Sequence, residues 1–273
     1  MRASLLECVV AVLFAAAAAS RAVGAPIEAG DRAWAARAES IEVRLATPER
    51  VEEAIDHYRA AVVVDPLSLE ARWKLLRALH YAIDFTTLGE AAKDARVEEA
   101  VALASASGEA LDAEGATVRD RARLFFWSAI AWGARAQRVG LLTVVREGAA
   151  TQMHDYAERS LALDPTVDRG GALRLLARLH ATLPRVPFVS GWVDRARALP
   201  FAERANREDA AHPGNRLVLA LTLIDVAPER KKEARELLES VVEVAPRDDH
   251  RVEDLAIREQ AREELEKLRD ADG

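Results

Sequence analysis

The segment Ala61-Val-Val-Val-Asp-Pro66 ends an amphipathic stretch of the chain with a proline. Three later segments end in the same way: LALDP at 161–165, AAHP at 210–213 and VEVAP at 242–246. Proline ends a helix because it has no amide hydrogen to donate and because it restricts the residue before it. The first two of these prolines are 99 residues apart and the last two are 33 apart, so one period of 33 residues fits both intervals. A period of this length is typical of helical-repeat proteins.

The residues before Pro66 indicate how the helices of such a repeat would pack. Ala54, Tyr58 and Ala61 lie 12, 8 and 5 positions before this proline, which resembles the second helix of a tetratricopeptide repeat. The same offsets before Pro246 give a close match: Ala234, Leu238 and Val241. Small residues at such positions let neighbouring helix pairs approach closely, so that each pair can bury its apolar face.

Two segments that follow these prolines also resemble each other. WKLLRALH at 73–80 and LRLLARLH at 173–180 are identical at four of eight positions. The sequence therefore predicts an all-α fold, a right-handed helical-repeat solenoid of tetratricopeptide-like helix pairs. The last predicted helix, over 250–270, has a narrow apolar stripe among many charged residues, which is typical of the capping helix that ends a solenoid.

Apolar residues with a period near 3.6 predict helices, and the pattern predicts no strand. The predicted helices run over 28–45, 48–64, 68–84, 89–107, 117–138, 147–163, 168–183, 192–211, 214–226, 230–244 and 250–270. Two stretches interrupt the repeat. The segment 183–192 holds prolines, a glycine and aromatic residues, which predicts either an ordered insertion or a plain linker, whereas 105–117 predicts an exposed connection.

The first 24 residues have the pattern of a secretory signal peptide. Arg2 is followed by an apolar run over 9–19 and then by small residues, with Ala22 and Gly24 at the positions that determine cleavage. We therefore predict a signal peptide over 1–24 and a single solenoid domain over 25–273, exported to the periplasm or secreted. Glu7 stands before Cys8, where a lipoprotein signal has a small residue, so the sequence does not predict a lipoprotein.

Composition excludes several functional classes. The apolar run is too short to span a bilayer, and no later segment has the roughly 18 uncharged apolar residues of a transmembrane helix, so we expect a soluble mature protein. The full chain has a formal net charge of −7, which becomes −8 without residues 1–24, and this argues against nucleic acid and anionic membranes as partners. Cys8 is the only cysteine, so a chain without its signal peptide has no thiol for disulfides, metal binding or nucleophilic attack.

Motifs of catalysis are missing from the sequence. It contains no phosphate loop, dinucleotide-binding glycine fingerprint, nucleophile elbow or paired-histidine metal helix. The six histidines do not recur at metal-ligand spacing, and the carboxylates fall on solvated helix faces. We therefore predict that the protein is not an enzyme and has no catalytic residue, cofactor or metal site.

An aromatic cluster at 124–135 holds two of the six phenylalanines and two of the five tryptophans. On a helix Phe125 and Trp132 share one face and Trp127 lies on another, so the rings are either all core or partly exposed in a groove. The candidate groove residues are Trp127, Trp132, Arg135, Arg174 and Trp192. Arg174 interrupts an apolar helix, where its charge needs either an acidic partner or a bound anion.

The order of these features resembles the TatT-like T-component family of tripartite ATP-independent periplasmic transporters. The resemblance covers roughly 121–246 and consists of the aromatic helix, LALDP at 161–165, GALRLLARLH at 171–180, LPRVPF at 183–188 and NRLVLA at 215–220. It implies a periplasmic helical-repeat protein that associates with a substrate-binding protein and takes a small hydrophobic or acidic ligand in a groove or pore.

Two functions therefore remain open from the sequence. One is an exported, non-enzymatic scaffold that binds a protein partner. The alternative is a transporter-associated T-component that binds a periplasmic substrate-binding protein and a small hydrophobic or acidic ligand. The sequence leaves the identity of the partner and the formation of homo-oligomers undecided.

Overall fold

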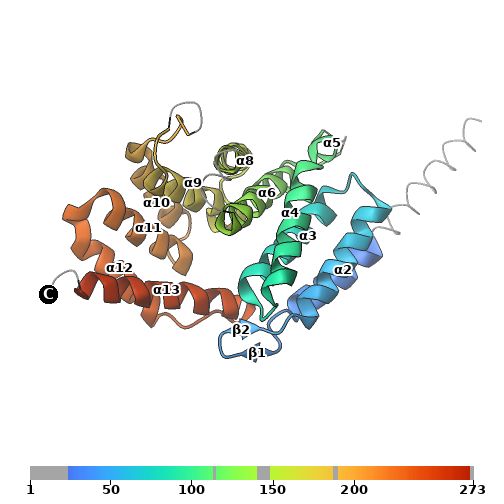
Figure 1. Cartoon of the computed structure of the whole chain (residues 1–273), viewed down its shortest axis with the longest axis horizontal. Coiled ribbons are helices and arrows are strands. Elements are labelled where there is room, and N and C mark those ends of the chain that lie inside the picture. The colour runs from blue at the N-terminus through green and yellow to red at the C-terminus, as the bar shows by residue number, and fades with distance from the viewer. Residues whose placement is uncertain (1–23, 113–114, 140–147, 187–189, 271–273) are drawn as a thin grey trace, which may run out of the picture.

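The computed structural model describes residues 24–112, 115–139, 148–186 and 190–270. Most of them are helical, which confirms the all-α prediction (Figure 1). After a helical stretch over 24–35, the helices are α2 (Glu49–Val64), α3 (Leu69–Phe85), α4 (Glu90–Ser105), α5 (Gly108–Leu111), α6 (Val118–Arg138), α8 (Ala149–Leu163), α9 (Gly171–Thr182), α10 (Arg195–Glu208), α11 (Pro213–Val226), α12 (Lys231–Glu243) and α13 (Arg251–Asp270). The predicted signal peptide lies outside the described residues except for Gly24.

Helix ends agree with the local signals in the sequence. α2 and α8 end two residues before their prolines, and Asp65 and Asp164 there accept backbone N–H bonds from Leu67 (3.0 Å) and Thr166 (2.9 Å). Such turns satisfy backbone groups that the ended helix leaves unpaired. The AAHP segment behaves differently: α10 has already ended at Glu208, and His212 caps the start of α11.

The first predicted helix, over 28–45, is wrong at its C-terminal end. The helix stops at residue 35, and β1 (Ile41–Glu42) and β2 (Leu45–Ala46) form a two-stranded antiparallel hairpin, so the prediction of no strand is also wrong. Apolar residues alternate at 41, 43 and 45, which is a strand period rather than a helical one. Ala46 is fully buried and bridges to Thr86 at the end of α3, which holds the hairpin against the helices.

The segment 105–117, predicted to be an exposed connection, contains α5. Within it Ser107 is buried: its Oγ accepts a bond from Arg72 (3.1 Å) and donates to the carbonyl of Leu103 (2.6 Å). Buried polar groups of this kind must be hydrogen-bonded, and the partners come from neighbouring helices. Most described residues of this segment are exposed, as predicted, whereas Ser107 and Ala110 are buried.

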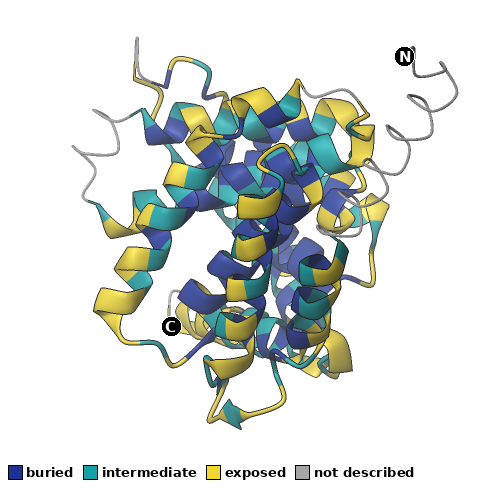
Figure 2. Ribbon diagram, turned by 90° about the vertical axis from the view of Figure 1, so that its right-hand side faces the viewer, coloured by how far each residue is buried: buried dark blue, intermediate teal, exposed yellow. Residues whose placement is uncertain are grey.

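The helices pack in chain order from α2 to α13, and α13 also contacts α3. The chain thus curves round until its last helix meets its first third, and the exposed residues lie mainly on the outward sides of the helices (Figures 1 and 2). Val252, at the start of α13, is fully buried in the N-terminal core. Arg37 donates hydrogen bonds to Glu253 at 2.8 Å and to the carbonyl of Asp249. These bonds hold the start of α13 against the N-terminal part of the chain.

Within the described part of the chain, no helix combines the length and apolar character needed to cross a bilayer.

Candidate functional site

Where the chain curves back on itself it forms a partly open cavity of about 700 Å³ between α3, α6, α9, α11 and α13. Its wall is rich in aromatic rings: Trp34, Trp73, Tyr81, Phe85 and Trp127. Among the described residues the wall also carries five arginines, at 37, 77, 123, 174 and 247, against three carboxylates, at 168, 249 and 253. The cavity therefore joins apolar surface to a surplus of positive charge, although the whole chain is acidic.

Arg77 lies in the middle of the aromatic wall. Its guanidinium is 4.0 Å from the ring centre of Trp34 and 5.0 Å from that of Trp73, and Arg123 lies 4.7 Å from the Trp73 ring. These are cation–π contacts, which are strengthened where water is excluded. Burial lowers the pKa of Arg77, because the charged form is the one that loses hydration.

Hydrogen-bonding groups in the same wall lack partners. Arg77 interacts with the Tyr58 hydroxyl and with the nearby charge of Asp31, which offset part of the effect of burial. It forms no ion pair with any described residue, and its Nε is buried without a hydrogen-bond acceptor. The hydroxyl of Tyr81 and the Nη1 of Arg247 are likewise buried donors without a described partner. Buried donors without acceptors are costly. An acceptor-rich ligand would reduce that cost.

The opposite wall is built on an unusual backbone. Asp168, Arg169 and Gly170 have consecutive positive φ angles of 49°, 52° and 89°. Only glycine adopts this region without strain, and strain of this kind gathers at functional sites. The turn places the Asp168 carboxylate against Arg174, which also donates to Asn215 Oδ1 at 2.8 Å.

His212 completes this wall at the start of α11. Its Nδ1 accepts the N–H of Gly214 at 3.1 Å, so in the neutral ring the proton is on Nε2. Burial, with added repulsion from Arg174 and Arg247, lowers the pKa of His212 to about 2. The ring therefore stays neutral and can act as a hydrogen-bond donor in the cavity wall.

The structure brings two of the five predicted groove residues to this cavity, Trp127 and Arg174. Trp132 instead packs with Ala149, Ala150 and Trp192. Arg135 pairs with Glu98 of α4. Thus the aromatic face of α6 that carries Trp132 is used for packing against α8.

Several cavity residues were not selected from the sequence, above all Trp34, Trp73 and Arg77. Arg77 stands between Leu76 and Ala78 in an apolar helix, which is the same signal that selected Arg174. The tryptophans gave no signal of their own, because an isolated ring at helical spacing is usually core.

A second cavity, of about 360 Å³, lies between α3, α6, α8 and α9 and is lined mainly by small apolar side chains. Charged groups in its wall have partners: His80 lies 3.2 Å from Asp84, and Arg178 lies 2.7 Å from Asp225. It offers no buried charge that needs a ligand, so the central cavity is the stronger candidate.

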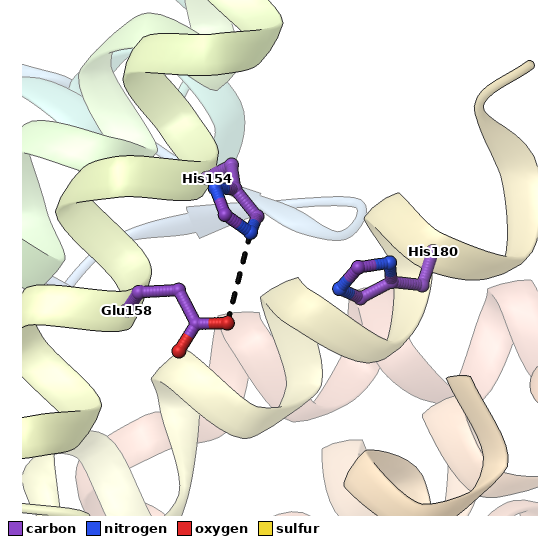
Figure 3. Close-up of side chains that lie close together, drawn as sticks. All are labelled: His154, Glu158 and His180. Atoms are coloured by element: carbon purple, nitrogen blue, oxygen red, sulfur yellow. Dashed lines mark ion pairs between the residues drawn. The ribbon is translucent and has the colours of Figure 1, made fainter. Parts of the chain in front are cut away.

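Outside both cavities, His154 and Glu158 of α8 and His180 of α9 direct ring nitrogens and a carboxylate toward one another (Figure 3). His180 is fully buried, and its Nδ1 accepts the N–H of Asp194 at 3.0 Å. Burial, with repulsion from Arg197, lowers the pKa of His180 to about 4. Trp192, a predicted groove residue, stacks on His154 with ring centres 4.1 Å apart.

No protein-family model matches the chain, and no curated protein matches it.

Proposed function

We propose that this protein is a non-enzymatic binding protein that holds a small anionic ligand with an apolar body in its central cavity. The observation that carries the proposal is Arg77, a guanidinium enclosed by Trp34 and Trp73 without an ion-pair partner among the described residues. Tyr58 and Asp31 offset only part of the hydration that this buried charge loses, so a bound anion would stabilise it further.

The geometry suits a carboxylate joined to an aliphatic or aromatic group. A guanidinium can bind both oxygens of a carboxylate through two parallel hydrogen bonds. The rings of Trp73, Tyr81 and Trp127 offer apolar area for the rest of the ligand. A volume of about 700 Å³ falls in the usual range of small-molecule sites.

Tryptophan fluorescence and calorimetry with decanoate and 3-phenylpropanoate test this proposal, with decanol and 3-phenylpropanol as uncharged controls. We expect the carboxylates to bind and the alcohols to bind at least tenfold more weakly. Arg77→Met keeps the apolar stem and removes the charge, so it should weaken carboxylate binding at least tenfold without lowering the melting temperature.

Arg135→Met is the matched control, because Arg135 pairs with Glu98 outside the cavity. It should bind the carboxylates like the wild type. Unchanged carboxylate affinity in Arg77→Met, or equal affinity of the wild type for acids and alcohols, would refute the proposed ligand class.

We also propose that the helices form a right-handed solenoid of tetratricopeptide-like pairs capped by α13. Support comes from the predicted close-contact positions Ala54, Tyr58, Ala61, Ala234 and Leu238, which are all fully buried. In addition, α9 contacts α11 and α11 contacts α13, as stacked pairs require.

A neighbouring pair of alanines tests the repeat register. Ala61 is fully buried, whereas Ala60 is exposed. Ala61→Trp should lower the free energy of unfolding by roughly 1–3 kcal/mol or more, because a large ring cannot fit at a close helix contact. Ala60→Trp should stay within about 0.5 kcal/mol of the wild type. Equal shifts in urea-unfolding midpoints would show that the proposed register is wrong.

On this basis we propose a role like that of a TatT-like T-component, exported and associated with a periplasmic substrate-binding protein. A protein-interaction scaffold is the second candidate, supported by the exposed apolar side chains Val63, Val64 and Leu67 at the end of α2. Co-sedimentation with a substrate-binding protein encoded beside this chain tests both roles. If the protein is a T-component, decanoate should change its affinity for the substrate-binding protein. If it is a scaffold, the affinity should be the same with and without decanoate.

A further inference from the structure

The group formed by His154, Glu158 and His180 has the geometry of an incomplete metal coordination shell. The potential ligand atoms all lie within 4.8 Å of one another, and they come from two helices, α8 and α9 (Figure 3). His154 and Glu158 are one helical turn apart, so both side chains lie on the same face of α8. Two imidazoles and one carboxylate are a usual ligand set for zinc.

Both ring nitrogens that point into this group lack a hydrogen-bond partner, and His154 Nε2 lies 3.6 Å from Glu158 Oε1 (Figure 3). The Nε2 atoms of His154 and His180 are buried and form no hydrogen bond with a described residue. His154 can donate its Nδ1–H to the Asp155 carboxylate at 3.1 Å, which leaves the lone pair on Nε2 free. A carboxylate behind a histidine ring is the usual support of a metal-bound imidazole.

His180 needs one rearrangement before it can bind a cation. Because its Nδ1 accepts the N–H of Asp194, the neutral ring carries its proton on Nε2. Coordination would move this proton to Nδ1, so the bond from the Asp194 amide would be lost. The negative charge of Asp194 acts to raise the pKa of His180, which partly offsets the effect of burial. One backbone hydrogen bond is a small loss beside the gain from a coordinated metal.

We propose that His154, Glu158 and His180 bind a divalent transition-metal ion of the zinc type. Nitrogen-rich ligands favour Zn²⁺, Co²⁺ and Ni²⁺ over Ca²⁺ and Mg²⁺. Arg197 donates to Glu158 Oε1 at 2.8 Å and must share or release that carboxylate, so the ion competes with an existing ion pair. The ion would tie α8 to α9 and order the ring of Trp192 on His154.

Titration of the untagged full chain with Zn²⁺ and Co²⁺ after chelator treatment tests the site. We expect one ion per chain, visible Co²⁺ absorption typical of a four-coordinate site, and a change in tryptophan fluorescence through Trp192. Mg²⁺ should produce neither signal.

His180→Asn is the decisive variant, because its side-chain oxygen can still accept the Asp194 N–H while nothing replaces Nε2. It should bind Zn²⁺ at least tenfold more weakly, as should Glu158→Gln, with melting temperatures near that of the metal-free wild type. His57→Asn on α2 is the matched control and should bind like the wild type. Absence of Zn²⁺ binding by the wild type, or equal Zn²⁺ affinity in His180→Asn, would overturn the proposal. Neither result depends on whether the central cavity binds an anion.

Discussion

Two arginines that interrupt apolar helices have different surroundings in the cavity wall. Arg174 bonds to Asn215 and pairs with Asp168, so it has the acidic partner that was one of its two predicted surroundings. Arg77 has aromatic rings around it and forms no ion pair with a described carboxylate, although the charge of Asp31 acts on it. The need for an external anion is therefore greater at Arg77, which can only be seen once both environments are known.

Arg174→Leu should lower the free energy of unfolding by about 1–2 kcal/mol, because it leaves the Asp168 carboxylate and the side-chain oxygen of Asn215 without the guanidinium that they bind. The estimate is modest because the Asp168 side chain is 38% exposed and water can replace part of the lost contact. Urea unfolding of Arg174→Leu and Arg77→Leu measures the difference. If Arg174→Leu matched the wild type while Arg77→Leu were less stable, the assigned roles would be reversed.

His212 predicts a dependence of stability on pH. Its pKa is lowered to about 2 in the folded protein, whereas an unfolded histidine titrates near 6.5. Between these values only the unfolded chain takes up the proton, so His212 reduces stability progressively as the pH falls below about 6.5. Above that pH the effect vanishes.

His212→Asn should weaken this dependence, because asparagine can still cap α11 and does not titrate. Between pH 6 and pH 4 the free energy of unfolding of the variant should fall less steeply, by up to about 1.4 kcal/mol per pH unit. Urea titrations at several pH values measure the slope. Identical slopes for variant and wild type would contradict the assignment of a buried neutral ring.

Among the elements, α13 has a larger role than that of a terminal cap. It packs on α11 and α12, and its first turn reaches α3 and the segment that contains Arg37. Arg44 adds an ion pair with Glu259 at 2.5 Å. The helix therefore forms one wall of the cavity, which explains why its apolar stripe is narrow: the cavity faces part of its surface.

Val252→Ala should lower the free energy of unfolding by about 1–3 kcal/mol, because it leaves a void in the N-terminal core. Val63→Ala removes the same atoms from a side chain that is 75% exposed and should change stability by less than about 0.5 kcal/mol. Chemical unfolding compares the two. A small effect at both positions would mean that α13 does not close the molecule in solution.

In the whole molecule, the contact of α13 with the N-terminal core couples the stability of the two ends of the chain. In an open repeat array the two ends are independent. Stability in an open array is a sum of local units, which can unfold separately. Here the first core contains a residue of the last helix, so opening one end exposes apolar surface at the other.

We therefore expect one cooperative urea transition. All five tryptophans lie between positions 34 and 192, so fluorescence reports the first two thirds of the chain, whereas far-ultraviolet circular dichroism reports every helix. The two midpoints should coincide in the wild type and separate in Val252→Asp, which places a charge in the N-terminal core. Separate midpoints in the wild type would contradict the coupling.

The sequence by itself determined the helices from α2 to α13 to within a few residues, because helical periodicity, proline stops and capping side chains act over a few positions. It failed over 41–46, and within 105–117 it missed α5 and the burial of Ser107, because contacts with α3 and its neighbours override weak local preferences. It also selected Arg174 by its position within an apolar helix and Trp127 by its place in an aromatic cluster.

Only the tertiary structure decided which of these residues share a site. Arg37 and Glu253 are 216 positions apart, and the pairing of His154 and Glu158 with His180 depends on how α9 packs on α8. Contacts across such intervals leave no periodic pattern in the sequence, because each residue also fits the pattern of the helix in which it lies. The cavity forms because α13 packs against the N-terminal part of the chain, and His154, Glu158 and His180 come together because α8 and α9 stack. Burial in these places then lowers the pKa values of Arg77, His180 and His212.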